Sequence, residues 1–426
     1  MSYAVPTTKQ HSSGLMRWRA FQAFGMALVT IIFLVPFYVY HGASFDEQSA
    51  KAASRILLVL FLLVSSFVLR VRFYKHPELD VSILYAYAAF SALSIFYSSD
   101  PLFSAFRVFD LLVFIWFASF LSGLIKDLDG VVRYVEIALY TYLLGFVLIV
   151  FLLDVDFMRP MGLGATSRLG GFVINPNLFA YCVLFLIAAN LYFFRERNLV
   201  IFSFILGMLL FFLFMTYSRS AMIALIVMCV LFKFRDPKIQ KLKHIAFFVL
   251  LPALLVGLWP WVLSYLERGH GLENLLSLGG RTLFWGGLIV EPNWTQNIIY
   301  GLGYQMLSEA GLSSTVDNLN ISMAHNNFIQ SLLGLGILGL ALNVAFWVAH
   351  FIRISRSIRI FNVREYNFII LVSVTTFIYS VIEFGIFGPS TIIAPLFFLV
   401  VFKCARVATM RRRHNHLGRK LINRLA

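Results

Sequence analysis

Long apolar runs recur along the chain, and short polar or charged segments separate them. A helix needs about 20 predominantly apolar residues to cross the hydrocarbon core of a bilayer. About twelve runs approach that length, so the pattern predicts about twelve membrane-spanning helices. The centres of the predicted helices are Leu28, Leu63, Ala88, Val113, Leu144, Leu184, Gly207, Val227, Leu254, Leu340, Val374 and Leu399.

Basic residues precede the first predicted helix and follow every second one. Loops rich in Lys and Arg stay on the cytoplasmic side of a membrane. The alternation therefore places both ends of the chain in the cytoplasm, and it supports the helix count, because one missed helix would scramble it. The basic segments are 9–19, 70–75, 126–133, 195–197, 233–243, 353–364 and 411–420.

The composition agrees with a chain that lies in lipid. Of 426 residues, 60% are hydrophobic and only 13% are charged, and the mean hydropathy is +0.83. A soluble protein of this length could not bury so much apolar surface in one core. The net charge of +15 is explained by the cytoplasmic loops, so nucleic acid is not expected as a partner. The sequence predicts an all-α membrane protein surrounded by membrane lipids.

One outward-facing segment is much longer than the others. Segment 267–325 is too long for a simple connector, and loops of that length are usually functional. Its aromatic residues predict short helices that lie on the membrane surface. The chain is thus expected to have five parts: a cytoplasmic segment at 1–19, nine helices at 20–266, this loop, three helices at 326–404 and a basic cytoplasmic tail at 405–426.

Four outward-facing segments carry polar motifs, at 167–177, 216–220, 279–285 and 325–328. The first three contain Arg168, Arg219 and Arg281. Arginine stays charged and offers a planar fork of donors that suits phosphate and pyrophosphate. An arginine at a lipid–water boundary is costly unless an anion satisfies it. A structural salt bridge or a side chain that reaches the interface is the alternative for each of the three.

His325 opens the fourth motif, where the long loop re-enters the membrane. An imidazole can accept a proton near neutral pH, so His325 is a candidate general base. The alternative is an ordinary polar residue at the interface. Asn326 and Asn327 are candidates for substrate contact or for capping the helix that follows.

Several other residues are weaker candidates. Glu383 is expected to pair with another charged residue inside the bundle, as are Arg107, Asp110 and Glu136. Trp285 and Tyr304 could stack on a sugar, but an aromatic belt at the membrane surface explains them equally well. Three glycines near the start of one helix are expected to let helices pack closely. They are Gly334, Gly336 and Gly339.

The sequence has no cluster with metal-ligand spacing on the outward face and no nucleotide-binding glycine loop. We therefore expect neither a metal nor a nucleotide cofactor.

Taken together, the four motifs resemble those of the O-antigen ligase and O-antigen polymerase superfamily of bacterial envelopes. The resemblance runs from about Leu144 to Gly388. Each motif is short, but their order and their common side make the combination more specific than any one of them. The matching elements are 168–177, Ser218-Arg219, Gly280-Arg281 with Trp285, and His325-Asn326 at the start of a glycine-rich helix.

The resemblance implies a glycosyltransferase of GT-C-like architecture in the bacterial inner membrane, with its active site facing the periplasm. The donor would be a glycan on undecaprenyl pyrophosphate, and the acceptor a sugar hydroxyl of lipid A–core oligosaccharide. Arg219 and Arg281 would hold the pyrophosphate, and His325 would accept the hydroxyl proton during one inverting displacement. The other expected substrate-binding residues are Arg168, Asn175, Asn177 and Asn326.

Within the superfamily, an O-antigen polymerase and a protein O-oligosaccharyltransferase are the alternatives to a ligase. The long loop that ends at the histidine favours a ligase. A transporter or flippase is the rival from a different class. Transporters place their polar site near the bilayer midplane, on broken helices in repeated halves. Here the polar motifs gather at one interface, and we find no repeated halves.

Overall fold

The computed structural model describes residues 55–60, 62–64, 78–152, 154, 156–160, 167–170, 174–233, 285–286, 297–306, 324–383, 385–387 and 391–425. Helices dominate these residues. They are α3 (Leu79–Leu93), the 3-10 turn η1 (Ser94–Phe96), α4 (Pro101–Leu124), α5 (Leu128–Leu152), α6 (Pro176–Tyr192), α7 (Leu199–Met215), α8 (Arg219–Lys233), α14 (Asn327–Arg356), α15 (Val363–Ile382) and α16 (Ile393–Leu425).

Most of the predicted helix centres lie inside these helices. The predicted centres from Ala88 to Val227 fall in α3 to α8, and those from Leu340 to Leu399 fall in α14 to α16. Residues 55–60 and 62–64, around the predicted centre Leu63, are also helical. The predicted helices around Leu28 and Leu254 lie outside the described residues.

Six described helices are long and apolar enough to cross a membrane. They are α3 with η1, α4, α5, α14, α15 and the first part of α16. Helices α6, α7 and α8 are apolar but shorter, with 17, 17 and 15 residues. The all-α membrane fold is therefore confirmed, whereas the total of twelve spans and their orientation stay predictions.

One small hairpin was not expected from the sequence. Strand β1 (Met158–Pro160) pairs antiparallel with β2 (Ser167–Leu169), and Arg159 lies opposite Arg168. Gly170 follows β2 with φ 110°, a conformation that glycine adopts without steric cost. The hairpin thus places Arg168 next to the first turn of α6 and the turn before α8.

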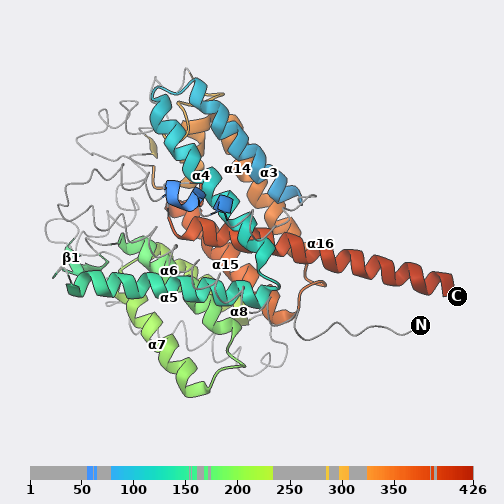
Figure 1. Cartoon of the computed structure of the whole chain (residues 1–426). Helices are drawn as coiled ribbons and strands as arrows, with labels where there is room; N and C mark the ends of the chain where they lie inside the picture. Colours follow the sequence, from blue (N-terminus) through green and yellow to red (C-terminus); the bar gives the residue numbers. More distant parts are fainter. Residues whose placement is uncertain are drawn as a thin grey trace.

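Helices α15 and α16 form the centre of the bundle (Figure 1). Helix α15 packs against α6 and α8, α16 packs against α4 and α5, and α3 runs along α14. Nearly all of α6 is buried, which fits a helix that is apolar on every side. Helix α7 instead exposes large apolar side chains such as Val200 and Phe204. Exposed apolar surface of this kind suits contact with lipid tails.

Local sequence explains where two of the spans begin. Asp100 caps α4 by accepting a hydrogen bond from the Phe103 amide, and Pro101 fills the first helical position. Asn362 and Glu365 cap α15 reciprocally, each side chain accepting from the backbone amide of the other. These caps satisfy amides that have no partner within the helix.

Buried charges join α3, α14 and α15 at one end of the bundle, which we call the Asp80 end. Asp80 Oδ2 lies 2.7 Å from Arg353 Nη2 and 3.0 Å from His350 Nδ1. His350 Nε2 lies 2.9 Å from Ser373 Oγ. Charges within apolar helices are tolerated when they pair in this way. The cluster therefore fixes the relative position of the three helices.

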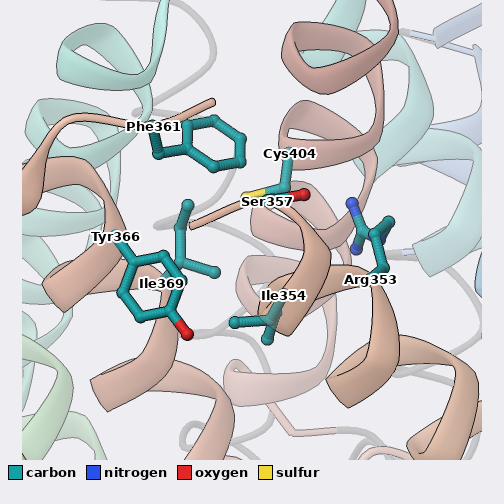
Figure 2. A pocket seen from close by; sticks show the side chains of 7 residues that line it. All are labelled: Arg353, Ile354, Ser357, Phe361, Tyr366, Ile369 and Cys404. Atoms are coloured by element: carbon teal, nitrogen blue, oxygen red, sulfur yellow. The ribbon is translucent and has the colours of Figure 1, made fainter. Parts of the chain in front are cut away.

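The connection between α14 and α15 closes the same end. Figure 2 shows Phe361, Tyr366 and Ile369 around a narrow pocket, with Cys404 of α16 on its other side. Arg353 lies beside this pocket as well.

Helix α16 continues from the last predicted span into the basic segment and projects beyond the bundle (Figure 1). Arg411 Nη1 lies 2.8 Å from Glu365 Oε2 near the start of α15, and Arg412 Nη1 lies 3.3 Å from Glu78 Oε1 near the start of α3. The basic residues that follow the last span thus also hold two other helices.

Candidate functional site

Four helix ends meet at the end of the bundle opposite Asp80. Helices α6, α8 and α14 begin there, and α15 ends there. Side-chain hydrogen bonds connect the four ends. We call Arg168, Asn177, Glu383 and His325 together the His325 network.

Arg168 connects the hairpin to two of the helices. Its Nε donates to the carbonyl oxygen of Thr216, 2.8 Å away in the turn before α8. Its Nη2 donates to Asn177 Oδ1, 2.7 Å away in the first turn of α6. The arginine is buried, with 7% of its surface exposed. A rigid fork is required to reach both acceptors at once. Arg168 is therefore a buried side chain that supports the site by holding the hairpin against α6 and the turn before α8.

Asn177 connects Arg168 to Glu383. Its Nδ2 donates to Glu383 Oε1, which lies 2.7 Å away just beyond the C-terminal end of α15. Asn177 thus accepts from a guanidinium and donates to a carboxylate. That polarised arrangement strengthens both bonds in a buried setting.

Glu383 meets His325 with its other oxygen. Oε2 lies 3.4 Å from His325 Nδ1, a distance longer than a typical N–H···O bond but within reach of one. The glutamate side chain is 2% exposed, whereas that of the histidine is 29% exposed. An ionised carboxylate only accepts hydrogen bonds, so it favours the tautomer with the proton on Nδ1. In that tautomer the lone pair is on Nε2, which makes Nε2 the ring nitrogen able to accept a proton.

Two residues of the site have a left-handed backbone. Tyr217 has φ 48° and lies in the turn before α8, and His325 has φ 49° and lies just before α14. For a residue with a side chain, this conformation costs about 1–2 kcal/mol. Strain of this kind persists where the surrounding structure holds it, and it gathers at functional sites.

Arg219 is the first residue of α8 and is partly exposed. Thr216 and Ser218 of the preceding turn are fully buried. Because Arg168 holds the Thr216 carbonyl, the hairpin also fixes the backbone three residues before Arg219. The structure thus brings Arg219 to the same bundle end as the His325 network.

Two of the predicted substrate-binding residues cap helices. Asn175 Oδ1 accepts from the Asn177 amide at 2.9 Å, at the start of α6. Asn326 Oδ1 accepts from the amides of Phe328 and Ile329, at 2.9 and 3.0 Å, at the start of α14. The capping role considered for Asn326 from the sequence is therefore seen in the structure.

Residues 297–306 of the long loop pack into a break in α14. Gly336 has φ 66°, which is not helical. The amides of Leu302 and Gly303 donate to the carbonyls of Leu333 and Gly334, at 3.0 and 2.9 Å. A Cβ on Gly336 would lie 2.1 Å from a backbone oxygen of the loop. Gly334 and Gly336, which were expected to serve helix packing, therefore let the loop backbone approach instead.

Tyrosines hold this loop segment in place. Tyr97 donates to the Tyr300 carbonyl at 2.8 Å, and Tyr304 donates to the Phe387 carbonyl at 3.0 Å. Burial raises the pKa of Tyr97 to about 12 and that of Tyr304 well above its usual value. Both hydroxyls therefore stay protonated and keep donating. Tyr304 is only 2% exposed, so it neither stacks on a sugar nor joins a surface belt.

Trp285 joins the loop to the residue before the histidine. Its Nε1 donates to the Ala324 carbonyl at 2.6 Å. The role predicted for Trp285 at the membrane surface stays a prediction beside this specific hydrogen bond. Arg281 lies outside the described residues, so its predicted role rests on the sequence. In the described parts of the chain, no three His, Cys, Asp or Glu side chains gather as metal ligands.

A comparison with protein families found one similarity. Residues 203–344 match the family model described as O-antigen ligase. This part of the chain is therefore similar to O-antigen ligases. A search of curated proteins found no match. The match covers about one third of the chain and includes Arg219, Arg281 and His325.

Three members of the His325 network lie outside the segment that matches the O-antigen ligase model. Arg168 and Asn177 precede it, and Glu383 follows it. Sequence analysis selected the first two as site residues, but it assigned Glu383 to an ion pair within the bundle. The only sequence signal for Glu383 was an acidic residue at the end of an apolar helix. The match agrees with the resemblance predicted from the motifs, and it supports an enzyme of the ligase and polymerase kind.

Proposed function

We propose that this protein transfers O-antigen polysaccharide from undecaprenyl pyrophosphate to a sugar hydroxyl of lipid A–core oligosaccharide. We assign the reaction to the periplasmic face of the bacterial inner membrane. The contact between Glu383 and His325 carries the proposal, because it orients a partly exposed imidazole at a bundle end where Arg219 also lies. The family match supports the chemistry, since this superfamily contains O-antigen ligases.

In the proposed reaction, the acceptor hydroxyl oxygen attacks the anomeric carbon of the donor sugar. The bond from that carbon to the pyrophosphate oxygen breaks as the new glycosidic bond forms. His325 Nε2 takes the hydroxyl proton, and Glu383 stabilises the imidazolium that results. A single displacement of this kind inverts the configuration at the anomeric carbon.

Arg219 and Arg281 are assigned to the departing pyrophosphate. Negative charge develops on the pyrophosphate oxygens as the bond to the anomeric carbon breaks. Arginines already in place stabilise that charge. The first turns of α6, α8 and α14 add a favourable field, because helix N-terminal ends carry partial positive charge. The donor is already activated, so the proposal requires no nucleotide.

Reconstitution tests the proposal. Purified protein in liposomes would receive lipid-linked O-antigen and lipid A–core, without nucleotide. A ligase yields lipid A–core that carries the polysaccharide. Longer lipid-linked glycan would instead indicate a polymerase. A glycosylated acceptor protein, in place of lipid A–core, would indicate an oligosaccharyltransferase. Donor carried across the bilayer with no new glycosidic bond would indicate a flippase and would contradict the proposal.

A further inference from the structure

A cavity of about 280 Å³ with charged residues in its lining lies at the Asp80 end of the bundle, at the opposite end from His325. It forms where α3 begins, α14 ends and α16 passes both. Eight residues line it: Glu78, Leu79, Asp80, Ala349, Ile352, Arg353, Arg356 and Arg412.

The cavity lies at the level expected for lipid headgroups. Three of the segments apolar enough to cross a membrane end at its wall, at Leu79, Arg356 and Arg412. Leu79 and Ile352 expose 68% and 44% of their surface on the outside of the bundle. Apolar side chains that face lipid tails therefore continue directly into the charged lining. A lipid headgroup could enter while its tails remain against the helices.

The charges of the lining leave a surplus of positive charge. Asp80 is one of the lining residues, and it pairs with Arg353 at 2.7 Å. Glu78 accepts from Arg412 at 3.3 Å and from Thr409 at 2.8 Å. Arg356 is exposed and has no ion pair within the part of the chain that the structure describes. Two matched pairs and one further guanidinium thus give the cavity a net charge of about +1.

A second cavity provides a contrast. It measures about 360 Å³ and is lined by residues of α5 and of the segment between α6 and α7. Its two arginines both face glutamates, Arg133 at 4.0 Å from Glu196 and Arg197 at 2.5 Å from Glu136. That lining is balanced in charge. The surplus charge therefore distinguishes the cavity at Arg356.

We propose that the cavity at Arg356 binds the phosphodiester headgroup of an anionic phospholipid. Arg356 donates to the phosphate oxygens, and Arg412 forms the adjacent wall. The paired carboxylates hold the arginine side chains in place instead of repelling the ligand. Basic pockets between membrane helices are known to suit lipid phosphates, and each exposed Lys or Arg near the surface contributes about 1 kcal/mol. The site is separate from the proposed transferase reaction.

Thermal unfolding of the detergent-purified full chain tests the site. The probe is dioctanoyl phosphatidylglycerol, compared with dioctanoyl phosphatidylcholine and with inorganic phosphate at equal concentration. Phosphatidylglycerol should raise the Tm in a saturable manner, and the other two should not. Arg356→Ala should weaken the apparent affinity about fivefold, the loss expected for one such arginine. The control is Arg359→Ala, an exposed arginine outside the lining, which should bind as the wild type does.

Three results would overturn the proposal. Equal affinity in the Arg356→Ala and wild-type proteins would show that the lipid binds elsewhere. An equal shift with phosphatidylcholine would mean that the tails alone are recognised. A full shift with inorganic phosphate would identify a free anion, not a lipid, as the ligand. Because Arg356 is exposed, its replacement should not affect folding, and the Tm without lipid verifies this.

Discussion

Glu383 Oε2 lies 3.4 Å from His325 Nδ1, although the two residues are 58 positions apart in the chain. The glutamate ends α15, and the histidine precedes α14. Because Asn177 holds the second oxygen of the same carboxylate, the side chain of Glu383 has one fixed orientation. This geometry fixes the orientation of the His325 imidazole, on which the proposed reaction depends.

Glu383→Gln should lower the rate of glycosyl transfer by at least about tenfold, while the KM for the donor changes little. The amide can reach both neighbours, but it lacks the negative charge that stabilises the imidazolium. Steady-state kinetics measures both constants, and thermal unfolding verifies that the variant folds. A wild-type rate of transfer in the folded variant would contradict this role of Glu383.

Arg168→Lys should destabilise the protein by roughly 2–3 kcal/mol and lower its activity. Lysine keeps the charge, but it cannot donate to Thr216 and Asn177 in the fixed geometry of the guanidinium. Thermal unfolding and transfer assays measure both effects. Arg133→Lys is the matched control, because that side chain is 64% exposed and its ion pair measures 4.0 Å. Equal Tm values for the two variants would argue against a supporting role for Arg168.

Arg219→Lys should raise the KM for the lipid-linked donor and lower kcat, because the planar fork suits two pyrophosphate oxygens and the ammonium does not. Kinetics with increasing donor checks this. Full activity with lysine would mean that the site requires only positive potential near α8, and the assignment of a bidentate contact would then be wrong.

Gly301→Ala should displace the loop from α14. Gly301 has φ 75°, and a Cβ would lie 2.4 Å from the backbone of Gly334. Limited proteolysis should cut the 297–306 segment faster in this variant than in the wild type, and transfer should fall because the loop ends at His325. Gly207→Ala is the control, since a Cβ there meets nothing within 4 Å and should be neutral or slightly stabilising. Equal cleavage of both variants would contradict the proposed docking.

The sequence predicted the parts of this site that depend on local pattern. Apolar runs located the described spans, and motif positions brought Arg168, Asn177, Arg219 and His325 to one end of the bundle. These features depend on hydropathy and chain alternation, which are visible within short windows. The family resemblance agrees with the family match of residues 203–344.

These local patterns could not predict contacts between distant segments of the chain. Glu383 had no sequence neighbour that pointed to His325, so an ion pair in the bundle was the natural expectation. Gly334 and Gly336 looked like helix-packing glycines, because a break in a helix filled by a loop leaves no distinct signal. Tyr304 was assigned to the surface, yet its hydroxyl reaches a buried carbonyl. In each case the partner lies far along the chain.

The most direct test is the single-turnover rate of His325→Ala in liposomes loaded with lipid-linked O-antigen and lipid A–core. With saturating donor, the account predicts a fall of roughly 10²–10⁴-fold in the transfer step, the usual contribution of a general base. Donor binding should remain close to that of the wild type. Transfer by His325→Ala at the wild-type rate would contradict the assignment of His325 as the base.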